Sequence, residues 1–370
     1  MTKPAPLQQI DRTYVRFQGR KLSYFSGCDY FRLASHPEVS AAVQAGVRRF
    51  GLNVAASRLT TGDHILYGQL EQHLARFFAA PDAVLVSTGY ATNLVVAQAL
   101  VGNFSHVLLD EESHPSLVDA AHLLGCPVLR FRHLDPGSLG SAIRRCGPGA
   151  RLLLLTDGMF SHNGSTAPLA AYLKILPQDG MILVDDAHAA GVLGRNGQGS
   201  LEHAGVSRRR IIQTITLSKA LGVFGGAILG TAGLRRKIIG RSHIFIGSTP
   251  PPLPLAYAAL RALEILSKDC SLRRRLQHNT TYLKGALRAA GLPLADTPGP
   301  MVGLVPESPR AASLLSAALL AAGVYPPLIK YPGGPSQGYF RFVVSSEHTR
   351  EQLERLVGVL SKAASRCSAR

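Results

Sequence analysis

The sequence has no long apolar segment and no paired cysteines. Hydrophobic residues make up 46% of the 370 residues, yet no apolar run approaches the ~20 residues that a membrane-spanning helix needs. Residues 1–10 carry one lysine and no apolar core, unlike a secretory signal peptide. The cysteines at positions 28, 126, 146, 270 and 367 form no CxxC pair, which argues against a zinc cluster or a disulfide framework. We therefore expect a cytoplasmic protein without a membrane span.

Acidic residues are scarce. The sequence has 23 Asp and Glu but 40 Lys and Arg, which gives a formal net charge of +17. The basic residues are dispersed, apart from small clusters such as Arg208–Arg210 and Arg273–Arg275. Aromatic residues do not alternate with these basic residues, unlike in proteins that bind single-stranded nucleic acid. We interpret most of this charge as solvated surface and expect no nucleic-acid partner. The charge also suits an anionic substrate, such as a phosphate-bearing thioester.

Internal repeats and low-complexity linkers are absent, and the central part of the chain alternates helical and strand-like segments. Helical patterns cover residues 37–50 and 68–78, among others. The short β-rich runs between such patterns are Ala83–Ser87, His106–Asp110, Val128–Arg132, Arg151–Thr156, Met181–Asp185 and Ile211–Thr216. This alternation predicts an α/β fold whose mainly parallel sheet carries helices on both faces.

The two ends of the chain differ from this central alternation. Residues 1–40 predict an N-terminal arm with short extended pieces, and residues 41–265 predict a large domain. Residues 266–370 predict a smaller C-terminal α/β domain on which the arm packs. The expected elements around and within that domain are a long helical region at 255–290, strands at 301–305 and 339–344, and a last helix at 349–364.

Polar residues or glycines directly follow several of the predicted strands. Ligands bind at the carboxyl ends of strands in an open parallel sheet, so these positions are the first candidates for a site. They are Gly89, Tyr90, Asp185, His188, Thr216 and Lys219.

These residue types meet the chemical needs of pyridoxal phosphate. The cofactor needs a lysine amine for its Schiff base and a carboxylate at the pyridine nitrogen. Its phosphate needs backbone N–H groups at a helix N-terminus and a hydroxyl. Lys219, Asp185, Gly89–Tyr90 and Thr216 can supply these groups. Each residue taken alone has an ordinary structural explanation, so the prediction depends on their order and spacing together.

From about Ser26 to Leu360 the sequence resembles the α-oxoamine synthases. These are pyridoxal-phosphate enzymes that include 8-amino-7-oxononanoate synthase, 5-aminolevulinate synthase, 2-amino-3-ketobutyrate ligase and serine palmitoyltransferase. The most specific motifs are Val184–Gly194 and Thr216–Gly222. The resemblance implies the aminotransferase-like fold type I of these enzymes. Further motifs lie at residues 29–30, 57–58, 88–93, 110–114, 157–161 and 341–349.

The resemblance implies a cofactor role for five side chains. Lys219 corresponds to the Schiff-base lysine and Asp185 to the aspartate at the pyridine nitrogen. His188 corresponds to the histidine that hydrogen-bonds the phenolic oxygen of the cofactor, and Ser161 to a serine near it. His114 corresponds to the histidine that stacks on the cofactor ring.

The resemblance also implies how the phosphate is held. Gly89, Tyr90 and Thr216 correspond to phosphate contacts within one subunit. Ser248 and Thr249 lie where the neighbouring subunit of this family lends a hydroxyl to the phosphate. The implied assembly is therefore a homodimer with its active sites at the interface.

The reaction implied by the resemblance is a decarboxylative condensation. A small α-amino acid, with its carboxylate held by Arg341, would join an acyl thioester of coenzyme A or of an acyl-carrier protein to give an α-aminoketone. Lys219 would move the Cα proton, and His114 would donate to the developing oxyanion. The alternatives are an aminotransferase on the same fold and a catalytically inactive binding protein. The presence of Lys219, Asp185 and His188 argues against the second alternative.

Several positions depart from the pattern of the family. Cys28 replaces an asparagine, Tyr67 replaces a histidine, and Asn163 replaces an aspartate. Gly333 lies in a loop that lacks the substrate-contacting threonine of the family. The cofactor positions are therefore kept while the substrate positions have changed, so the resemblance supports the cofactor more firmly than any one substrate.

Overall fold

The computed structural model describes residues 6–330 and 336–368, so the departure at Gly333 lies outside the described residues. The chain divides into two compact units. The larger unit comprises residues 36–160 and 166–269. The smaller unit comprises the residues up to Ser35, residues 161–165, and the residues from Cys270 onward. The sequence prediction did not separate residues 161–165 from the large domain. Among the described residues, no helix is long and apolar enough to cross a membrane.

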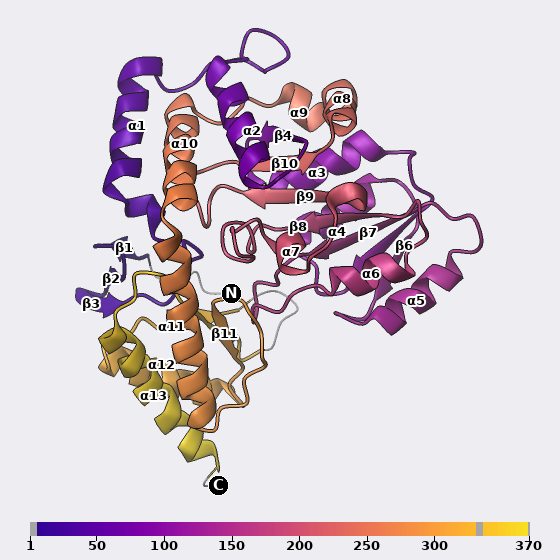
Figure 1. The fold of residues 1–370 in the computed structure, drawn as a ribbon. Helices are drawn as coiled ribbons and strands as arrows, with labels where there is room; N and C mark the ends of the chain where they lie inside the picture. Colours follow the sequence, from indigo (N-terminus) through magenta and orange to yellow (C-terminus); the bar gives the residue numbers. More distant parts are fainter. Residues whose placement is uncertain (1–5, 331–335, 369–370) are drawn as a thin grey trace. The chain divides into compact units, whose positions relative to one another are not determined.

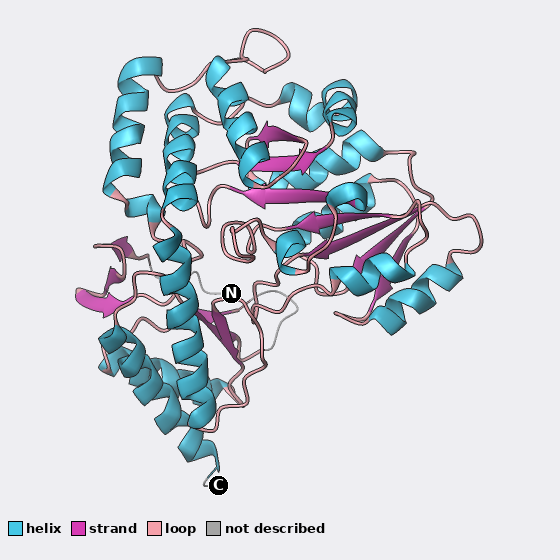
Figure 2. Cartoon of the chain, in the orientation of Figure 1, coloured by secondary structure: helices cyan, strands magenta, loops and turns pink. Residues whose placement is uncertain are grey.

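A seven-stranded sheet forms the centre of the larger unit, with the order β4-β10-β9-β8-β7-β5-β6. Neighbouring strands run parallel, except that β10 runs antiparallel to both β4 and β9. The mainly parallel α/β sheet predicted from the sequence is therefore confirmed (Figure 2). The strands are β4 (Asp82–Val86), β5 (His106–Asp110), β6 (Val128–Phe131), β7 (Leu152–Asp157), β8 (Met181–Asp185), β9 (Ile211–Thr216) and β10 (Gly226–Gly230).

Helices cover both faces of this sheet (Figure 1). Alternate residues of β7 show why: Leu153 and Leu155 join the apolar core on one face, and Leu152 and Leu154 join the core on the other. The first core is completed by α3 (Gly89–Leu100), α4 (Pro115–Leu123), α8 (Ala232–Arg241) and α9 (His243–Gly247). The second is completed by α5 (Pro136–Arg145), α6 (Leu169–Ile175) and α7 (Ser200–His203).

Three further helices pack together in the larger unit. The helix α10 (Leu253–Lys268) packs against α1 (Pro37–Phe50) and α2 (Ile65–Phe77), and α2 also packs against β4. The long helical region expected over residues 255–290 is confirmed and consists of two successive helices, because α10 ends before Asp269 (φ −97°, ψ 83°) and α11 (Cys270–Ala289) begins directly after it. The strand β10 was not predicted, because the glycines that surround it are typical of a loop.

The smaller unit contains two short antiparallel sheets. One comprises β1 (Gln8–Gln9), β2 (Tyr14–Phe17) and β3 (Arg20–Ser23). The other has the order β11-β13-β12, with β11 (Met301–Leu304), β12 (Leu328–Ile329) and β13 (Tyr339–Val343). The strands expected near 301–305 and 339–344 and the extended pieces of the arm are confirmed. Its helices are α11, α12 (Pro309–Ala321) and α13 (Arg350–Ser368).

Candidate active site

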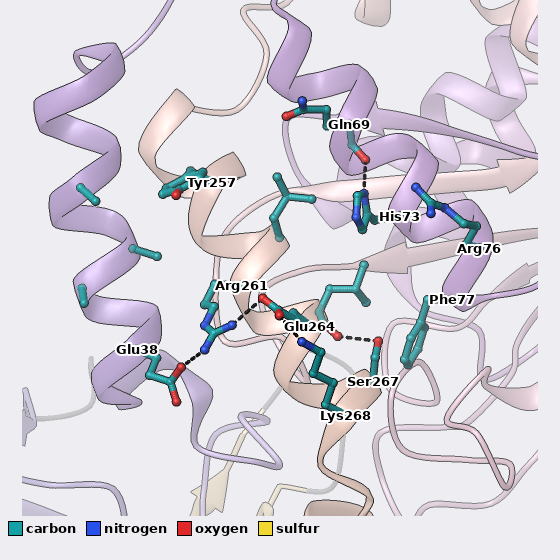
Figure 3. A pocket seen from close by; sticks show the side chains of 15 residues that line it. Glu38, Gln69, His73, Arg76, Phe77, Tyr257, Arg261, Glu264, Ser267 and Lys268 are labelled. Atoms are coloured by element: carbon teal, nitrogen blue, oxygen red, sulfur yellow. Dashed lines mark hydrogen bonds and ion pairs between the residues drawn. The ribbon is translucent and has the colours of Figure 1, made fainter.

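A wide hollow of about 1050 Å³ lies among α1, α2 and α10 of the larger unit. Four of its charged side chains pair with one another, as Figure 3 shows. Arg261 pairs with Glu38 and with Glu264, and Lys268 pairs with Glu264 at 2.6 Å. Such exposed pairs are typical of a solvated helix surface. This hollow is therefore not a candidate active site.

A smaller cavity of about 270 Å³ lies where the parallel strands end. It brings together seven of the residues predicted from the sequence and five that were not predicted as site residues. The predicted ones are Gly89, Tyr90, His114, Asp185, His188, Thr216 and Lys219. The others are Thr88, Ser116, Asp157, Ala187 and Ser218. A cluster of titratable groups in a cavity at the carboxyl edge of a parallel sheet is the usual signature of an active site.

The N-terminus of α3 forms one end of this cavity. Thr88 caps the helix, because its hydroxyl accepts the N–H of Ala91 at 3.1 Å. A Cβ atom at Gly89 would lie 2.6 Å from the Cβ of Thr216, so only glycine allows this close approach. The Thr216 hydroxyl accepts the N–H of Ser218 at 3.1 Å. The N–H groups at this helix end and the adjacent hydroxyl are suited to a phosphate.

Asp185 presents a firmly held carboxylate to the cavity. It ends β8 and lies between Asp157 of β7 and Thr214 of β9 in the register of the sheet. Its Oδ1 accepts the N–H of Ala187 at 2.9 Å, and its Oδ2 accepts from Asn93 Nδ2 at 2.7 Å. Because the side chain is buried and both oxygens are engaged, it can face a protonated ring nitrogen in a fixed direction.

Asp157 is a second buried carboxyl group in the same cavity. Burial, together with the neighbouring charge of Asp185, raises the pKa of Asp157 well above its ordinary value. Its Oδ2 accepts the backbone N–H of His114 at 2.8 Å. Sequence reasoning did not include Asp157 among the site residues, although it ends β7 just as Asp185 ends β8. The same strand-end signal could have found it.

His114 is a neutral imidazole in this setting. Burial lowers the pKa of His114, partly against the charge of Asp185. Its Nδ1 accepts the N–H of Ser116 at 3.2 Å and lies 2.7 Å from the Ser116 hydroxyl. The ring of Tyr90 lies edge-on to the imidazole, with 5.9 Å between centroids. The Tyr90 hydroxyl donates to Asp119, and this bond raises the pKa of Tyr90.

Lys219 and His188 complete the cavity wall. Lys219 follows β9 and is partly exposed, and His188 follows β8 and is buried. The charge of Lys219 acts on the titration of both His114 and Asp157, which places its amine within electrostatic reach of them.

Four predicted residues do not line this cavity. Ser248 donates its hydroxyl to the carbonyl of Ile244 at 2.5 Å, and Thr249 is exposed. Ser161 and Arg341 belong to the smaller unit, where Arg341 lies on β13. Among the described residues, the buried Nε of Arg341 makes no hydrogen bond.

The described departures from the family pattern make local contacts. Cys28 hydrogen-bonds the hydroxyl of the buried Tyr30. The Tyr67 hydroxyl donates to the carbonyl of Pro251 at 2.8 Å. The Asn163 side chain accepts the N–H of Ser165 at 2.9 Å. None of the three belongs to the residues that line the cavity.

The cavity fits pyridoxal phosphate. Gly89 allows close approach to the helix N-terminus, which would hold the phosphate. The buried carboxylate of Asp185 can pair with the ring nitrogen, and the amine of Lys219 lines the same cavity. The orientation of Asp185 and the neutral state of His114 agree with a site built around a flat, protonated ring.

Comparison with known proteins supports the same conclusion. Residues 25–360 match the model of the aminotransferase class I and II family. An 8-amino-7-oxononanoate synthase of Thioalkalivibrio sulfidiphilus is 36% identical over 348 residues, covering 93% of this chain and 89% of the relative. The serine palmitoyltransferase of S. paucimobilis has a TM-score of 0.92 at 26% identity, covering 100% of this chain and 94% of that chain.

A solved 8-amino-7-oxononanoate synthase from Francisella tularensis has a TM-score of 0.80 at 26% identity, covering 93% of this chain and 98% of that chain. The fold type and the cofactor expected from the sequence are thereby confirmed. The chain belongs to the α-oxoamine synthase family, and it is a pyridoxal-phosphate-dependent acyltransferase.

Proposed function

We propose that this enzyme condenses a small α-amino acid with an acyl thioester and releases carbon dioxide, in the manner of an 8-amino-7-oxononanoate synthase. The observation that carries the proposal is the shared cavity of Lys219, Asp185 and a neutral His114. A proton carrier, a fixed carboxylate and a hydrogen-bond donor are the groups that such a carbon–carbon bond formation requires.

The relatives are named after their product, 8-amino-7-oxononanoate, and the structure of this product indicates the substrates. It is a nine-carbon acid in which an amine-bearing carbon adjoins a ketone. Division between these two carbons gives alanine without its carboxyl group and a seven-carbon dicarboxylic acyl group. The reaction would form that carbon–carbon bond, break the Cα–carboxylate and carbonyl–sulfur bonds, and take up one proton to release carbon dioxide and the free thiol.

The cofactor supplies an electron sink that stabilises negative charge on Cα of the amino acid. Asp185 keeps the ring nitrogen protonated, and His188 and Ser161 serve the phenolic oxygen. The N–H groups of Gly89 and Tyr90, with Thr216, hold the phosphate. The resemblance implies these assignments, and the presence of each side chain except Ser161 in the cavity wall supports them.

One residue of this chain transfers a proton and a second donates a hydrogen bond during the reaction. The Lys219 amine removes the Cα proton and later returns a proton to the same carbon. His114 carries its proton on Nε2, because Nδ1 accepts the N–H of Ser116. It donates this proton in a hydrogen bond to the thioester carbonyl as negative charge develops there.

Arg341 binds the carboxylate of the amino acid, since a guanidinium matches a carboxylate in two parallel hydrogen bonds. Its unpaired buried Nε supports this role, because a buried donor without a partner is costly. The net charge of +17 is compatible with an anionic donor, either coenzyme A or an acyl-carrier protein.

The working form is a homodimer in which Ser248 and Thr249 of one copy serve the phosphate in the other. Thr249 is exposed, and neither residue lines the cavity of its own chain, which supports this assignment. The enzyme would act in the cytoplasm.

The test is a visible spectrum of the purified enzyme during titration with alanine, glycine and serine, followed by an acyl thioester, with product detected by mass. We expect one amino acid to perturb the spectrum and an aminoketone to form only after the thioester is added. Conversion of the cofactor to its amine form by amino acid alone would identify an aminotransferase instead. A protein that takes up no cofactor would be the inactive binding protein.

Two variants complete the test. Lys219→Ala should lose the absorbance of the lysine-bound cofactor and all turnover. Lys237→Ala, in α8 of the same unit, removes a lysine that does not line the cavity and should retain both. Full activity of Lys219→Ala would refute the proposal.

A further inference from the structure

Asn93 lies at the centre of a buried hydrogen-bond network beside the cavity. It belongs to α3 and is completely buried. Its Nδ2 donates to Asp185 Oδ2 at 2.7 Å and to Ser116 Oγ at 2.9 Å, and its Oδ1 accepts from Thr214 Oγ1 at 2.7 Å. The partners come from β8, α4 and β9, so one side chain ties three elements together. Both hydrogens and the oxygen of the amide are therefore engaged.

The direction of every proton in this network can be assigned. The backbone N–H of Ser116 can only donate, so Nδ1 of His114 is an acceptor. The Ser116 hydroxyl, 2.7 Å from the same nitrogen, therefore donates its proton to it. The hydroxyl oxygen then accepts from Asn93, which agrees with the orientation of the amide that Asp185 requires.

The network has two ends, and both line the cavity. At one end, Asp185 is held at Oδ2 by Asn93 and at Oδ1 by a backbone N–H. At the other end, the Nδ1 of His114 is occupied, so its proton lies on Nε2. Among the described residues, this Nε2 makes no hydrogen bond, which leaves it available to a bound molecule.

We infer that Asn93 is a positioning residue that orients Asp185 toward the cofactor ring and, through the hydroxyl of Ser116, orients the imidazole of His114. The inference rests on pyridoxal phosphate binding in this cavity and extends the proposed function to side chains outside the cavity wall. Asn93 touches neither cofactor nor substrate in this scheme, and it acts through Asp185 and His114.

The chemistry of the position favours an amide over similar side chains. Leucine has nearly the same shape but would remove the donor to Asp185 and the donor to Ser116 together. Aspartate would place a second acceptor against Asp185 Oδ2, which is repulsive. Ser116→Ala would separate the two ends, because it cuts the branch to His114 and leaves the bond from Asn93 to Asp185.

The chain offers a matched control in Asn279 of the smaller unit. This asparagine is also buried, and its Nδ2 donates to the carbonyl oxygens of Ser345 and His348, both at 3.0 Å. Asn279→Leu therefore removes an equally engaged buried amide that has no connection to Asp185. It reports the general cost of losing such a group.

The experiment compares Asn93→Leu and Asn279→Leu as holoenzymes. The readouts are the pH titration of the visible cofactor band, the dissociation constant of the cofactor, and kcat and KM for the amino acid. Asn93→Leu should shift the midpoint of the band by about one pH unit and weaken cofactor binding about 10-fold. It should lower kcat at least about 10-fold with little change in KM. Asn279→Leu should change the thermal midpoint only.

The band and the binding constant need no substrate, so they distinguish failure of this inference from failure of the proposed reaction. An Asn93→Leu enzyme with the band, cofactor affinity and kcat of the wild type would overturn the inference and leave Asn93 a structural residue.

Ser116→Ala provides a second test if Asn93→Leu does not fold. In apoprotein labelled with ¹⁵N-histidine, the wild-type His114 signals should show the Nε2–H tautomer, assigned by their loss in His114→Gln. Ser116→Ala keeps the backbone N–H that bonds Nδ1, so it should retain the Nε2–H tautomer. Loss of the hydroxyl bond should shift the Nδ1 signal and lower kcat, with unchanged cofactor affinity. An unchanged Nδ1 signal together with a wild-type kcat would overturn the link from Asn93 to His114.

Discussion

Each unit of the molecule holds a histidine whose Nδ1 accepts a backbone N–H, half-buried in the larger unit and buried in the smaller one. In the larger unit Ser116 donates to His114, and in the smaller unit Ser345 donates to His348 at 2.9 Å. The difference lies at Nε2. That of His348 is bonded to the carbonyl of Tyr24 at 3.1 Å, and its ring stacks on Phe25 with 4.0 Å between centroids.

The neighbouring asparagines repeat this contrast. Asn279 of α11 donates to two backbone carbonyl oxygens of the loop that follows β13 and so fixes this loop to the helix. Asn93 donates to two side chains that line the cavity. Similar residue types with similar burial thus serve stability in one unit and, in our proposal, chemistry in the other. The two networks differ in the surroundings of the histidine Nε2. In the smaller unit it bonds a backbone carbonyl, and in the larger unit it belongs to a side chain that lines the cavity.

The largest expected effect follows from removing the imidazole in the larger unit. His114→Phe should lower kcat by about 10²–10³, because a positioned donor of this kind contributes on that scale. His348→Phe, the matched change in the smaller unit, should keep kcat within about 2-fold at temperatures where the protein is folded. Steady-state kinetics and thermal unfolding of both variants check this, and equal losses of activity would erase the contrast between the two histidines.

The next effect sharpens the comparison within the larger unit, since not all its buried charges belong to the active site. Glu71 is buried and pairs with Arg58 at 2.5 Å and with Arg235 at 3.1 Å. Glu71→Ala should cost about 3 kcal/mol of unfolding free energy, because it leaves the two guanidinium groups without this partner. Denaturant unfolding measures the loss. The cofactor spectrum of the folded fraction should stay unchanged, and a displaced band would contradict the separation.

The pH dependence of stability tests the smaller unit. Burial lowers the pKa of His348 to about 3, below the ordinary value of about 6.5 expected in the unfolded chain. Between these values the unfolded chain binds a proton that the folded chain does not, so stability falls as the pH drops below about 6.5. The free energy of unfolding falls by up to ~1.4 kcal/mol per pH unit, so this one group should lower it by about 2 kcal/mol between pH 7 and pH 5.

Denaturant titrations of the wild type and of His348→Phe from pH 7 to pH 5 measure this contribution. The variant should be less stable at pH 7 and should lose less stability on acidification. Parallel curves for the two proteins would show that His348 does not carry the pH dependence.

The smallest effect concerns Lys284, a buried cation of the smaller unit. Its Nζ donates to the carbonyl oxygens of Thr297 and Gly299 and to the Thr297 hydroxyl. Lys284→Met should cost about 1 kcal/mol, because these acceptors lose their donor. Calorimetry measures the shift. Lys268→Met, which changes an exposed lysine, serves as the control and should leave the thermal midpoint unchanged. A Lys284→Met protein as stable as the wild type would show that Lys284 does not stabilise the fold.

The sequence by itself determined much of the larger unit. Apolar runs separated by helical patterns predicted six strands of the sheet, because strands that are covered on both faces must be apolar throughout. Polar residues at strand ends predicted that Asp185, Thr216 and Lys219 meet, because the carboxyl ends of parallel strands share one edge. No knowledge of the strand order was needed for that inference.

Only the tertiary structure decided the rest. The strand β10 and the break at Asp269 lie where local glycine or helix signals conflict with the final packing. The network of Asn93 joins residues 92 and 121 positions away in the chain, Asp185 and Thr214, and depends on which strands are neighbours. Hydrogen bonds at such separations are set by the strand order and by helix packing, and no local pattern in the sequence encodes them.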